Sequence, residues 1–480
     1  MACIVLACGA EGAQGEQAQA VKIDWNRVTE VSRTTATLQV VVNPRLRPNH
    51  ALAEAAFKAL KTLGANDVRY VPWLPYPRLA VAELKPPTPA GTSWNFRLID
   101  PMMKEFLGST EGRSTVMNFS TIPAWLFKTN RPVTYPADPD QVYWDYTQGT
   151  ELRDPTGKQL SEYYARLVSW YVDGGFRDEN GVLHESGYHY QFPIWEVLNE
   201  VDFEHEMTPE RYTARYDAIV SAIHKVSPNT KFMGLALAAP SADPKWFEYF
   251  LNHANHKTGT QIDYISYHFY ATPAPGETPN EWQYTFFDQA DGFLNTVRFV
   301  DAIRRRLSPQ TKVDLDELGV ILPTDNIPPI YWNACSALYS YLFIDLTRMG
   351  IDIAGMSQLV GYPTQFPSVS MMDWTNDKPN ARYWALKLIK DSFHPGDKLV
   401  KTSITSGGSD VEAQAFRTPG ARLLLLVNKR NRTEDVSLPD AGHAGVLVVD
   451  EKTGDGPARN VMPMNGEVKL SPFAVAVVHW

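Results

Sequence analysis

Short runs of apolar residues alternate with helical patterns along most of the chain, from about residue 36 to residue 392. Eight runs are nearly continuous in their apolar character, namely residues 37–42, 67–73, 113–120, 194–199, 231–237, 262–270, 312–318 and 351–358. Such runs are typical of parallel strands that are covered on both faces. Strands that alternate with helices predict βα units. Eight units fit an α/β fold of the (β/α)8 TIM-barrel type, which we expect over residues 36–394.

The helices between these runs have recognisable ends. Residues 208–228 begin with Thr208 as the expected N-cap and Pro209 at the first helical position, and apolar side chains then recur at helical spacing. Residues 331–350 predict a second helix, which Gly350 is expected to end. Both helices are expected to pack one face against the barrel.

The pattern changes after residue 395. Short strand-like runs separated by turn-rich pieces follow at residues 411–416, 421–428, 445–450 and 473–480. This spacing predicts a C-terminal all-β sandwich over residues 395–480. A lone strand pattern precedes the barrel, and we expect residues 21–35 to cross over and join the β domain.

Residues 1–20 contain a short apolar run, followed by small and polar residues that end in Ala18-Gln19-Ala20. This ending resembles a secretory cleavage site, although no Lys or Arg precedes the apolar run. We therefore expect a leader and a secreted or periplasmic protein. The alternative is a disordered tail on a cytoplasmic protein. No later segment has 18 consecutive apolar residues, so no membrane span is expected.

Composition narrows the class of protein. The chain has 480 residues, 44% of them apolar and 21% charged, which fits a soluble globular enzyme with one large and one smaller domain. The net charge of −9 argues against a nucleic-acid partner. Neither a P-loop nor a dinucleotide fingerprint is present, and we expect no cofactor. No motif specifies an oligomeric state.

Polar residues stand at three of the predicted strand ends. The fourth run ends on Asn199 and Glu200, the sixth ends with His268 and Tyr270, and the seventh carries Glu317. In a TIM barrel these ends meet at the active-site face. Hydrolysis of a glycosidic bond needs one protonated and one ionised carboxyl group flanking the sugar. The pattern therefore predicts a glycosidase whose partner is an oligosaccharide or glycoside.

These motifs resemble clan A of the glycoside hydrolases, and within it family 39, which includes β-xylosidases and α-L-iduronidases. "WEVLNE" resembles the acid/base motif of that family, and "ISYHFY" and "VDLDELG" resemble its signatures on strands six and seven. The trailing β-sandwich also fits the family's layout. The resemblance implies a retaining enzyme that cleaves a terminal or internal O-glycosidic bond of a plant- or microbe-derived glycan by double displacement.

The resemblance also implies roles for single residues. Glu200 is the expected acid/base and Glu317 the expected nucleophile. Four further side chains are implied around them: Asn199 on the sugar 2-hydroxyl, Tyr270 and His268 holding Glu317 or the substrate, and Arg69 hydrogen-bonded to the nucleophile. The chain departs from the family pattern at Asp316, where Thr or Ser is common. Because neighbouring strand residues alternate between faces, we expect Asp316 to point outward.

Aromatic side chains near strand ends are candidate platforms for the apolar face of a sugar. Trp125 lies just past the third run and Trp374 lies in the long loop after the eighth, and these two are the expected platforms. Trp73 and Trp282 are further candidates. For each, a position in the core is the alternative.

Two other classes of barrel protein stay open. A metal-dependent hydrolase needs clustered His and acidic ligands at strand ends. The early strands lack a His-x-His pair, and we expect no metal, although residues 203–207, "FEHEM", could contact a metal or the substrate. A non-catalytic carbohydrate-binding barrel is the second alternative. Such a protein would usually have lost one of the two carboxylates, and both are present.

Overall fold

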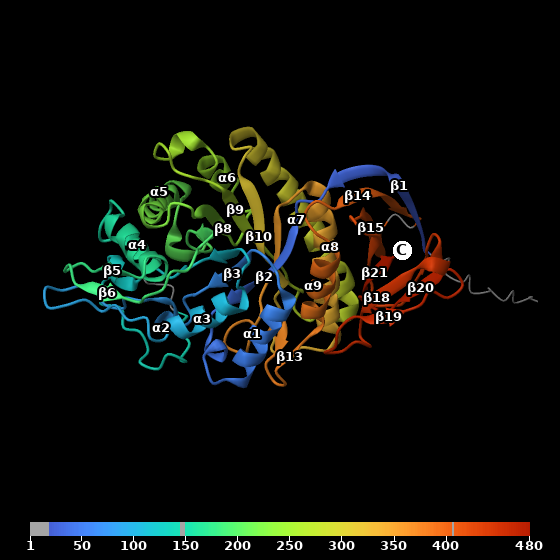
Figure 1. The fold of residues 1–480 in the computed structure, drawn as a ribbon, viewed down its shortest axis with the longest axis horizontal. Coiled ribbons are helices and arrows are strands. Elements are labelled where there is room, and N and C mark those ends of the chain that lie inside the picture. The colour runs from blue at the N-terminus through green and yellow to red at the C-terminus, as the bar shows by residue number, and fades with distance from the viewer. Residues whose placement is uncertain (1–18, 145–148, 406–407) are drawn as a thin grey trace, which may run out of the picture.

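A closed barrel of parallel strands forms the centre of the larger domain (Figure 1). The computed structural model describes residues 19–144, 149–405 and 408–480. Residues 1–18 of the expected leader therefore lie outside the described residues. The barrel strands are, in chain order, β2 (Thr35–Val41), β3 (Val68–Val71), β4 (Thr115–Met117), β7 (Ile194–Glu196), β8 (Lys231–Leu237), β9 (Tyr264–Ala271), β10 (Lys312–Val320) and β11 (Ile353–Met356). Each predicted run overlaps one of these strands, and the predicted TIM barrel is confirmed.

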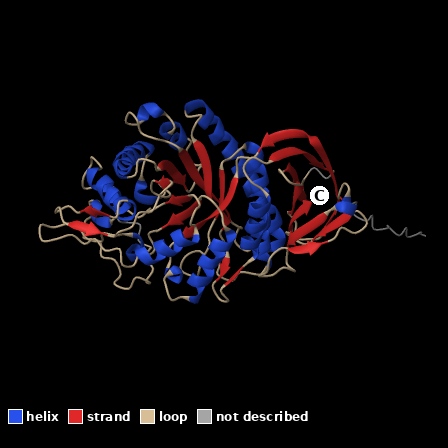
Figure 2. Ribbon diagram, in the orientation of Figure 1, coloured by secondary structure: helices blue, strands red, loops and turns tan. Residues whose placement is uncertain are grey.

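Helices surround the barrel on its outer face (Figure 2). They are α1 (Ala51–Leu63), α2 (Pro77–Ala80), α3 (Asp100–Ser109), α4 (Lys158–Val172), α5 (Pro209–Val226), α6 (Lys245–Phe250), α7 (Pro279–Leu307), α8 (Ile330–Met349) and α9 (Ala381–Ser392). The side chain of Thr208 accepts a hydrogen bond from the backbone of Arg211 and Pro209 opens α5, so the predicted cap is confirmed. Gly350 ends α8 with a φ of 71°, a left-handed conformation that glycine adopts without steric cost.

The C-terminal domain is built of β-strands, as expected, with one short 3₁₀ helix at Ala441–His443 among its described residues. Its strands are β14 (Lys398–Ile404), β15 (Val411–Arg417), β16 (Arg422–Asn428), β17 (Glu434–Ser437), β18 (Gly445–Val449), β19 (Arg459–Val461), β20 (Glu467–Leu470) and β21 (Val475–His479). The predicted runs correspond to the strands β15, β16, β18 and β21. The sequence pattern missed β14, β17, β19 and β20, which alternate more with polar residues and have less apolar character.

The first described strand, β1 (Gln19–Val31), belongs to the C-terminal sandwich rather than to the barrel. It pairs antiparallel with β14, and its first two residues pair with β17. The two pairings join the sheets of the sandwich, and β1 reaches across the top of this domain in Figure 1. Helices α8 and α9 lie between barrel and sandwich and contact strands of the latter. The first and the last described strands, β1 and β21, therefore lie in the same domain.

Two short hairpins lie outside the barrel and the sandwich, β5 (Gly175–Arg177) with β6 (Leu183–Glu185) and β12 (Met372–Asp373) with β13 (Lys378–Pro379). None of the described helices combines the length and the apolar character that a membrane crossing requires.

Candidate active site

A cavity of about 390 Å³ opens at the carboxyl ends of the barrel strands. Four of the residues expected at the site, Asn199, Glu200, Tyr270 and Glu317, line it. His268 and Arg69 are buried directly beneath and contact the carboxylates from below. Residues on or directly after the four strands β3, β7, β9 and β10 thus meet at one cavity, which is the position of the active site in TIM barrels.

Glu200 stands on an unusual stretch of backbone after β7. Leu198 and Glu200 have φ angles of 66° and 42°, in the left-handed region that residues with a side chain seldom adopt. The backbone amide of Glu200 donates to the carbonyl of Ala236 on β8, at 2.8 Å, which fixes the loop against the neighbouring strand. Non-glycine residues in this region are concentrated at functional sites, where the surrounding structure holds them in place. The loop aims the Glu200 side chain into the cavity.

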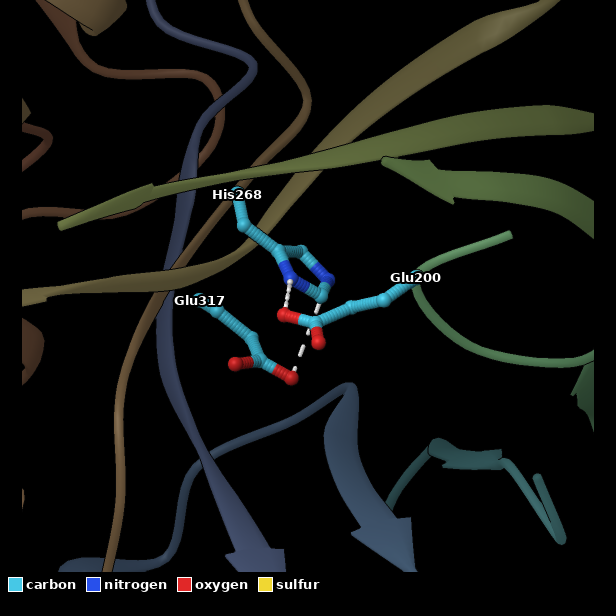
Figure 3. A group of neighbouring side chains, drawn as sticks. All are labelled: Glu200, His268 and Glu317. Carbon is cyan, nitrogen blue, oxygen red and sulfur yellow. Dashed lines mark hydrogen bonds and ion pairs between the residues drawn. The ribbon is translucent and has the colours of Figure 1, made fainter. Parts of the chain in front are cut away.

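The imidazole of His268 is directed at both expected catalytic carboxylates (Figure 3). Its Nδ1 atom is 3.2 Å from Oε1 of Glu200, and its Nε2 atom is 3.7 Å from Oε1 of Glu317. One carboxylate oxygen of Glu200, one of Glu317 and a ring nitrogen of His268 all lie within 4.8 Å of one another. Burial alone would lower the pKa of His268, but the charges of Glu317 and Glu200 outweigh it and raise this pKa.

Glu317 is held by hydrogen bonds to both of its oxygens. Arg69 donates to Oε1, and the hydroxyl of Tyr270 donates to Oε2. Burial alone would raise the pKa of Glu317, yet the charges of His268 and Arg69, together with the Tyr270 hydrogen bond, hold it below its ordinary value. Glu317 is therefore ionised, as a nucleophile requires.

The prediction that Asp316 points outward is wrong. The pairing of β10 with β9 shifts register between Asp314 and Glu317, which indicates a β-bulge that turns two consecutive acidic side chains to the same side. Asp316 is buried, with a carboxylate oxygen 2.9 Å from Nε of Arg69. Gly355 on β11 makes room for the bulge, because a Cβ there would lie 2.9 Å from the carbonyl oxygen of Asp316.

Arg69 organises the floor of the site. Its guanidinium pairs with three carboxylates, those of Glu196, Asp316 and Glu317. It also donates to the side chains of Asn199 and Gln39, at 2.7 Å each. A planar guanidinium can hold several acceptors in fixed directions, which an ammonium group cannot. Arg69 thus couples the expected nucleophile to Asn199, the residue before the expected acid.

Sequence reasoning missed Glu196. This residue is buried inside β7, and its carboxylate accepts hydrogen bonds from Arg69, Asn118 and Ser266. A charged residue within an otherwise apolar buried strand requires partners, since an unpaired charge there is very costly. That isolated charge in "IWEVLN" was the signal that could have revealed it.

Glu204 is a second residue that was not singled out. It is buried in the loop after Glu200, and its backbone amide donates to the Glu200 carbonyl. Its side chain accepts a hydrogen bond of 2.8 Å from Nε1 of Trp73. Burial, with a smaller contribution from the charge of Glu200, raises the pKa of Glu204 to about 8. A neutral carboxylic acid therefore lies beside Glu200 at neutral pH.

Aromatic rings form the rim of the cavity. Trp73 and Trp144 meet edge to face with ring centroids 5.5 Å apart, and Phe366 stacks on Trp73 at 6.4 Å. Trp73 was among the further candidates for a sugar platform. The two expected platforms do not line this cavity: Trp125 lines a separate one, and Trp374 lies half-buried in the hairpin between β12 and β13. Trp282 is buried in α7.

Glu200, His268 and Glu317 form the one group of His and acidic residues, within the described ranges, whose atoms are close enough to hold a metal ion. The Glu317 oxygen nearest to His268 already accepts a hydrogen bond from the Arg69 guanidinium. An added metal would compete with that bond and be repelled by the guanidinium. The loop "FEHEM" supplies Phe203 to the cavity wall, while the imidazole of His205 contacts the carbonyl of Gly149 at 2.9 Å.

Two family models match parts of the chain. Residues 166–313 match glycosyl hydrolases family 39, a segment that contains Glu200 and His268. Residues 408–478 match the C-terminal immunoglobulin-like domain of D-apionate lactonase, which lies outside the barrel. None of the curated proteins matches the chain.

Solved structures share the fold across almost the whole chain. A glucosidase from Croceicoccus marinus has 15% sequence identity and a TM-score of 0.63, covering 97% of this chain and 99% of its own. A GH51 arabinofuranosidase from Xanthomonas axonopodis pv. citri has 13% identity and a TM-score of 0.65, covering 97% and 100%. A GH30 endoxylanase from Clostridium papyrosolvens C71 has 13% identity and a TM-score of 0.58, covering 96% and 99%.

The combination of family match and fold defines the class of protein. The chain resembles the clan A glycoside hydrolases, and within them family 39, as the motifs predicted. The comparisons support glycosidase activity, and a glycosidase acts on a glycan substrate.

Proposed function

We propose that the protein is a retaining glycoside hydrolase, with Glu317 as nucleophile and Glu200 as acid/base. The observation that carries the proposal is the approach of a Glu200 oxygen to within 4.8 Å of a Glu317 oxygen across an open cavity. Retaining enzymes keep their carboxyl groups about 5–5.5 Å apart, whereas inverting enzymes separate them by about 6.5–9.5 Å to admit a water molecule. The short separation favours double displacement.

In the first step, an oxygen of Glu317 forms a bond to the anomeric carbon while the bond from that carbon to the leaving oxygen breaks. Glu200 gives its proton to the leaving oxygen. In the second step, Glu200 takes a proton from water, the water oxygen bonds to the anomeric carbon, and the bond to Glu317 breaks. Two inversions at the same carbon leave the product with the configuration of the substrate.

The surroundings of the two carboxylates support this division of roles. Glu317 accepts from Arg69 and Tyr270, and these contacts favour its ionised form. Glu200 is bounded by the neutral acid Glu204 on one side and by His268 on the other. Asn199 is fixed by Arg69 at the cavity wall, where its amide can donate to a sugar hydroxyl.

A screen of nitrophenyl glycosides tests the proposal. Proton NMR of the first product should show the anomer with the configuration of the substrate. Glu317→Ala should remove turnover, and azide should restore part of it by occupying the space of the lost carboxylate and attacking the anomeric carbon. Release of the inverted anomer, or full activity of Glu317→Ala, would exclude the mechanism. Absence of hydrolysis across the screen would instead favour a non-catalytic carbohydrate-binding barrel.

A further inference from the structure

A second and larger cavity lies on the loops that follow β3 and β4. Its volume is about 850 Å³, and five cationic side chains line it: Arg78, Lys85, Lys128, Arg131 and Arg153. Among the residues that the structure describes, no Asp or Glu contributes to its wall. This concentration of positive charge stands out in a chain whose net charge is −9. We refer to this cavity as the basic groove.

The cations of the basic groove keep their charge available. Arg78 donates to the carbonyl of Pro136 and Arg153 donates to the carbonyl of Trp125, so neutral acceptors orient both guanidinium groups. Lys128 pairs with Glu151 at 3.3 Å, but this pair is more than half exposed on both sides and therefore weak. Within the described chain, neither Lys85 nor Arg131 has an acidic partner within 4 Å. An incoming anion would not have to displace a buried ion pair.

Aromatic side chains complete the groove. The indole of Trp125 is fixed by a hydrogen bond of 2.9 Å from Nε1 to the carbonyl of Glu83, and Phe127 and Tyr135 contribute further rings. Sugar rings stack on such aromatic faces, while guanidinium groups bind carboxylate or sulfate oxygens in pairs. The combination suits an anionic carbohydrate better than a simple anion.

The basic groove and the catalytic cavity share one loop. Tyr135 lines the groove and meets Tyr143 edge to face at 5.6 Å, and the next residue, Trp144, stands at the rim of the catalytic cavity. On the inner side, the ring of Phe127 stacks at 4.5 Å on His205, which directly follows Glu204. A glycan that extends from the catalytic cavity can therefore follow this loop to the groove.

The catalytic cavity has the opposite character. None of its lining residues within the described chain is Lys, Arg or His, and its two charged residues are Glu200 and Glu317. A carboxylate on the sugar at the cleavage point would meet two acids and apolar walls, at a cost in desolvation and repulsion. A neutral sugar fits this cavity, so any charge on the substrate belongs elsewhere.

We propose that the basic groove binds an anionic stretch of a glycan, while the catalytic cavity receives a neutral sugar attached to it. As a statement about the substrate, this rests on the proposed glycosidase function. The shared chemistry of the anionic stretch is the uronate carboxylate or the sulfate ester. Both place negative oxygens on a pyranose ring that can stack on Trp125.

Direct binding tests the groove without turnover. Calorimetric titration of the full chain with oligogalacturonate should show binding that weakens with added salt, and the methyl-esterified form of the same oligosaccharide should bind weakly. Titration with dextran sulfate, compared with neutral dextran, shows whether the groove binds sulfate esters as well as carboxylates. The double variant Lys85→Glu with Arg131→Glu should reduce affinity for the anionic glycan by roughly tenfold or more, because two attractions become repulsions.

A matched control makes the same change in net charge on another face. Lys58→Glu with Lys61→Glu alters two exposed lysines of α1 and should leave glycan affinity within about twofold, since distant surface charges are screened. Thermal unfolding verifies that each variant is folded. The milder pair Lys85→Gln with Arg131→Gln provides the same test should charge reversal perturb the loop.

Three results would overturn the proposal. The esterified oligosaccharide could bind as tightly as the charged one, the control variant could lose as much affinity as the groove variant, or a single-stranded oligonucleotide could bind more tightly than either anionic glycan. Hydrolysis of nitrophenyl glycosides by the unaltered protein is measured separately. Failure of that assay with intact glycan binding would sink the proposed function and leave the groove assignment standing.

Discussion

The guanidinium of Arg69 donates a hydrogen bond to Glu317 although the two residues lie 248 positions apart in the chain. Arg69 stands on β3 and Glu317 on β10, so the closed barrel alone brings them together. The same guanidinium contacts Glu196 and Asp316, and three carboxylates thus depend on one cation. The integrity of the barrel and the ionisation of the proposed nucleophile are therefore linked through a single side chain.

Replacing Arg69 by Met should destabilise the protein and reduce turnover together. Removal of one partner of a buried ion pair costs about 3–5 kcal/mol, and here the carboxylates that remain would repel one another. Arg69→Lys should recover part of the stability but little of the turnover, because an ammonium group cannot hold the five acceptor side chains that Arg69 contacts. Denaturant unfolding measures the change in stability, and kcat measures the change in turnover. Arg305→Met, which breaks an exposed pair with Asp301, is the control and should cost about 1 kcal/mol or less.

Tyr270→Phe should move the acid limb of the pH–rate profile. The hydroxyl of Tyr270 donates to Glu317 and helps to lower the pKa of that carboxyl, so its loss should raise this pKa. Because the nucleophile must be ionised, activity would then be lost at a higher pH than in the unaltered enzyme. A hydrogen bond to a charged group contributes about 1.5–3 kcal/mol. The rate at the optimum should fall by roughly 10- to 100-fold.

The control for Tyr270→Phe is Tyr188→Phe, which removes a hydroxyl that donates to Asp100 outside the catalytic cavity. Its pH profile should superimpose on that of the unaltered enzyme. An acid limb that does not move in Tyr270→Phe would show that the limb reports a group other than Glu317.

The barrel was predictable from sequence because each of its strands is a short apolar run between amphipathic helices. The catalytic candidates Glu200 and Glu317 were predictable for the same reason, since a polar residue that ends such a run must lie at the rim of the barrel. The orientation of Asp316 was not predictable, because the alternation of side chains between the two faces of a strand fails at a β-bulge. The bulge also needs space on the neighbouring strand, which Gly355 provides. Trp144 and Phe366 were equally hidden, since loops set which aromatic rings meet over the cavity.

The contribution of Glu204 to the stability of the folded protein should decrease as the pH rises. Its pKa in the folded protein is raised to about 8, from an ordinary value of 4.5. Between these two values the unfolded chain releases the proton while the folded protein keeps it, so the free energy of unfolding falls with rising pH. This contribution is complete below about pH 4.5 and is lost as the pH passes 8. Glu204→Gln, which stays neutral and can still accept from Trp73, should flatten the slope.

Thermal unfolding at a series of pH values from 4.5 to 8.5 measures that slope. The exposed Glu206 in the same loop supplies the control, since Glu206→Gln should leave the slope unchanged. Some slope should persist in Glu204→Gln, because burial also raises the pKa of Glu83 to about 8. Identical slopes in the unaltered protein and Glu204→Gln would mean that Glu204 is ionised in the folded state.

Removal of divalent metal should leave turnover unchanged. The Glu317 oxygen that could contact a cation at this site already accepts a hydrogen bond from Arg69, and His268 is directed at carboxylates through both ring nitrogens. Dialysis against EDTA, followed by assay on a nitrophenyl glycoside, is the measurement. A loss of activity that zinc or manganese restores would instead favour the metal-dependent barrel hydrolase.

Phe366→Ala should weaken substrate binding more than it slows the chemical step. Phe366 stacks on Trp73 and meets Trp144 edge to face at the cavity rim. Loss of an aromatic contact removes about 0.5–1.5 kcal/mol beyond its buried area, so KM should rise several-fold while kcat changes little. Phe299→Ala truncates a comparably exposed ring on α7, away from the cavity, and should leave KM unchanged. If both variants raised KM equally, or if kcat fell alone in Phe366→Ala, the rim would not be the surface on which the sugar stacks.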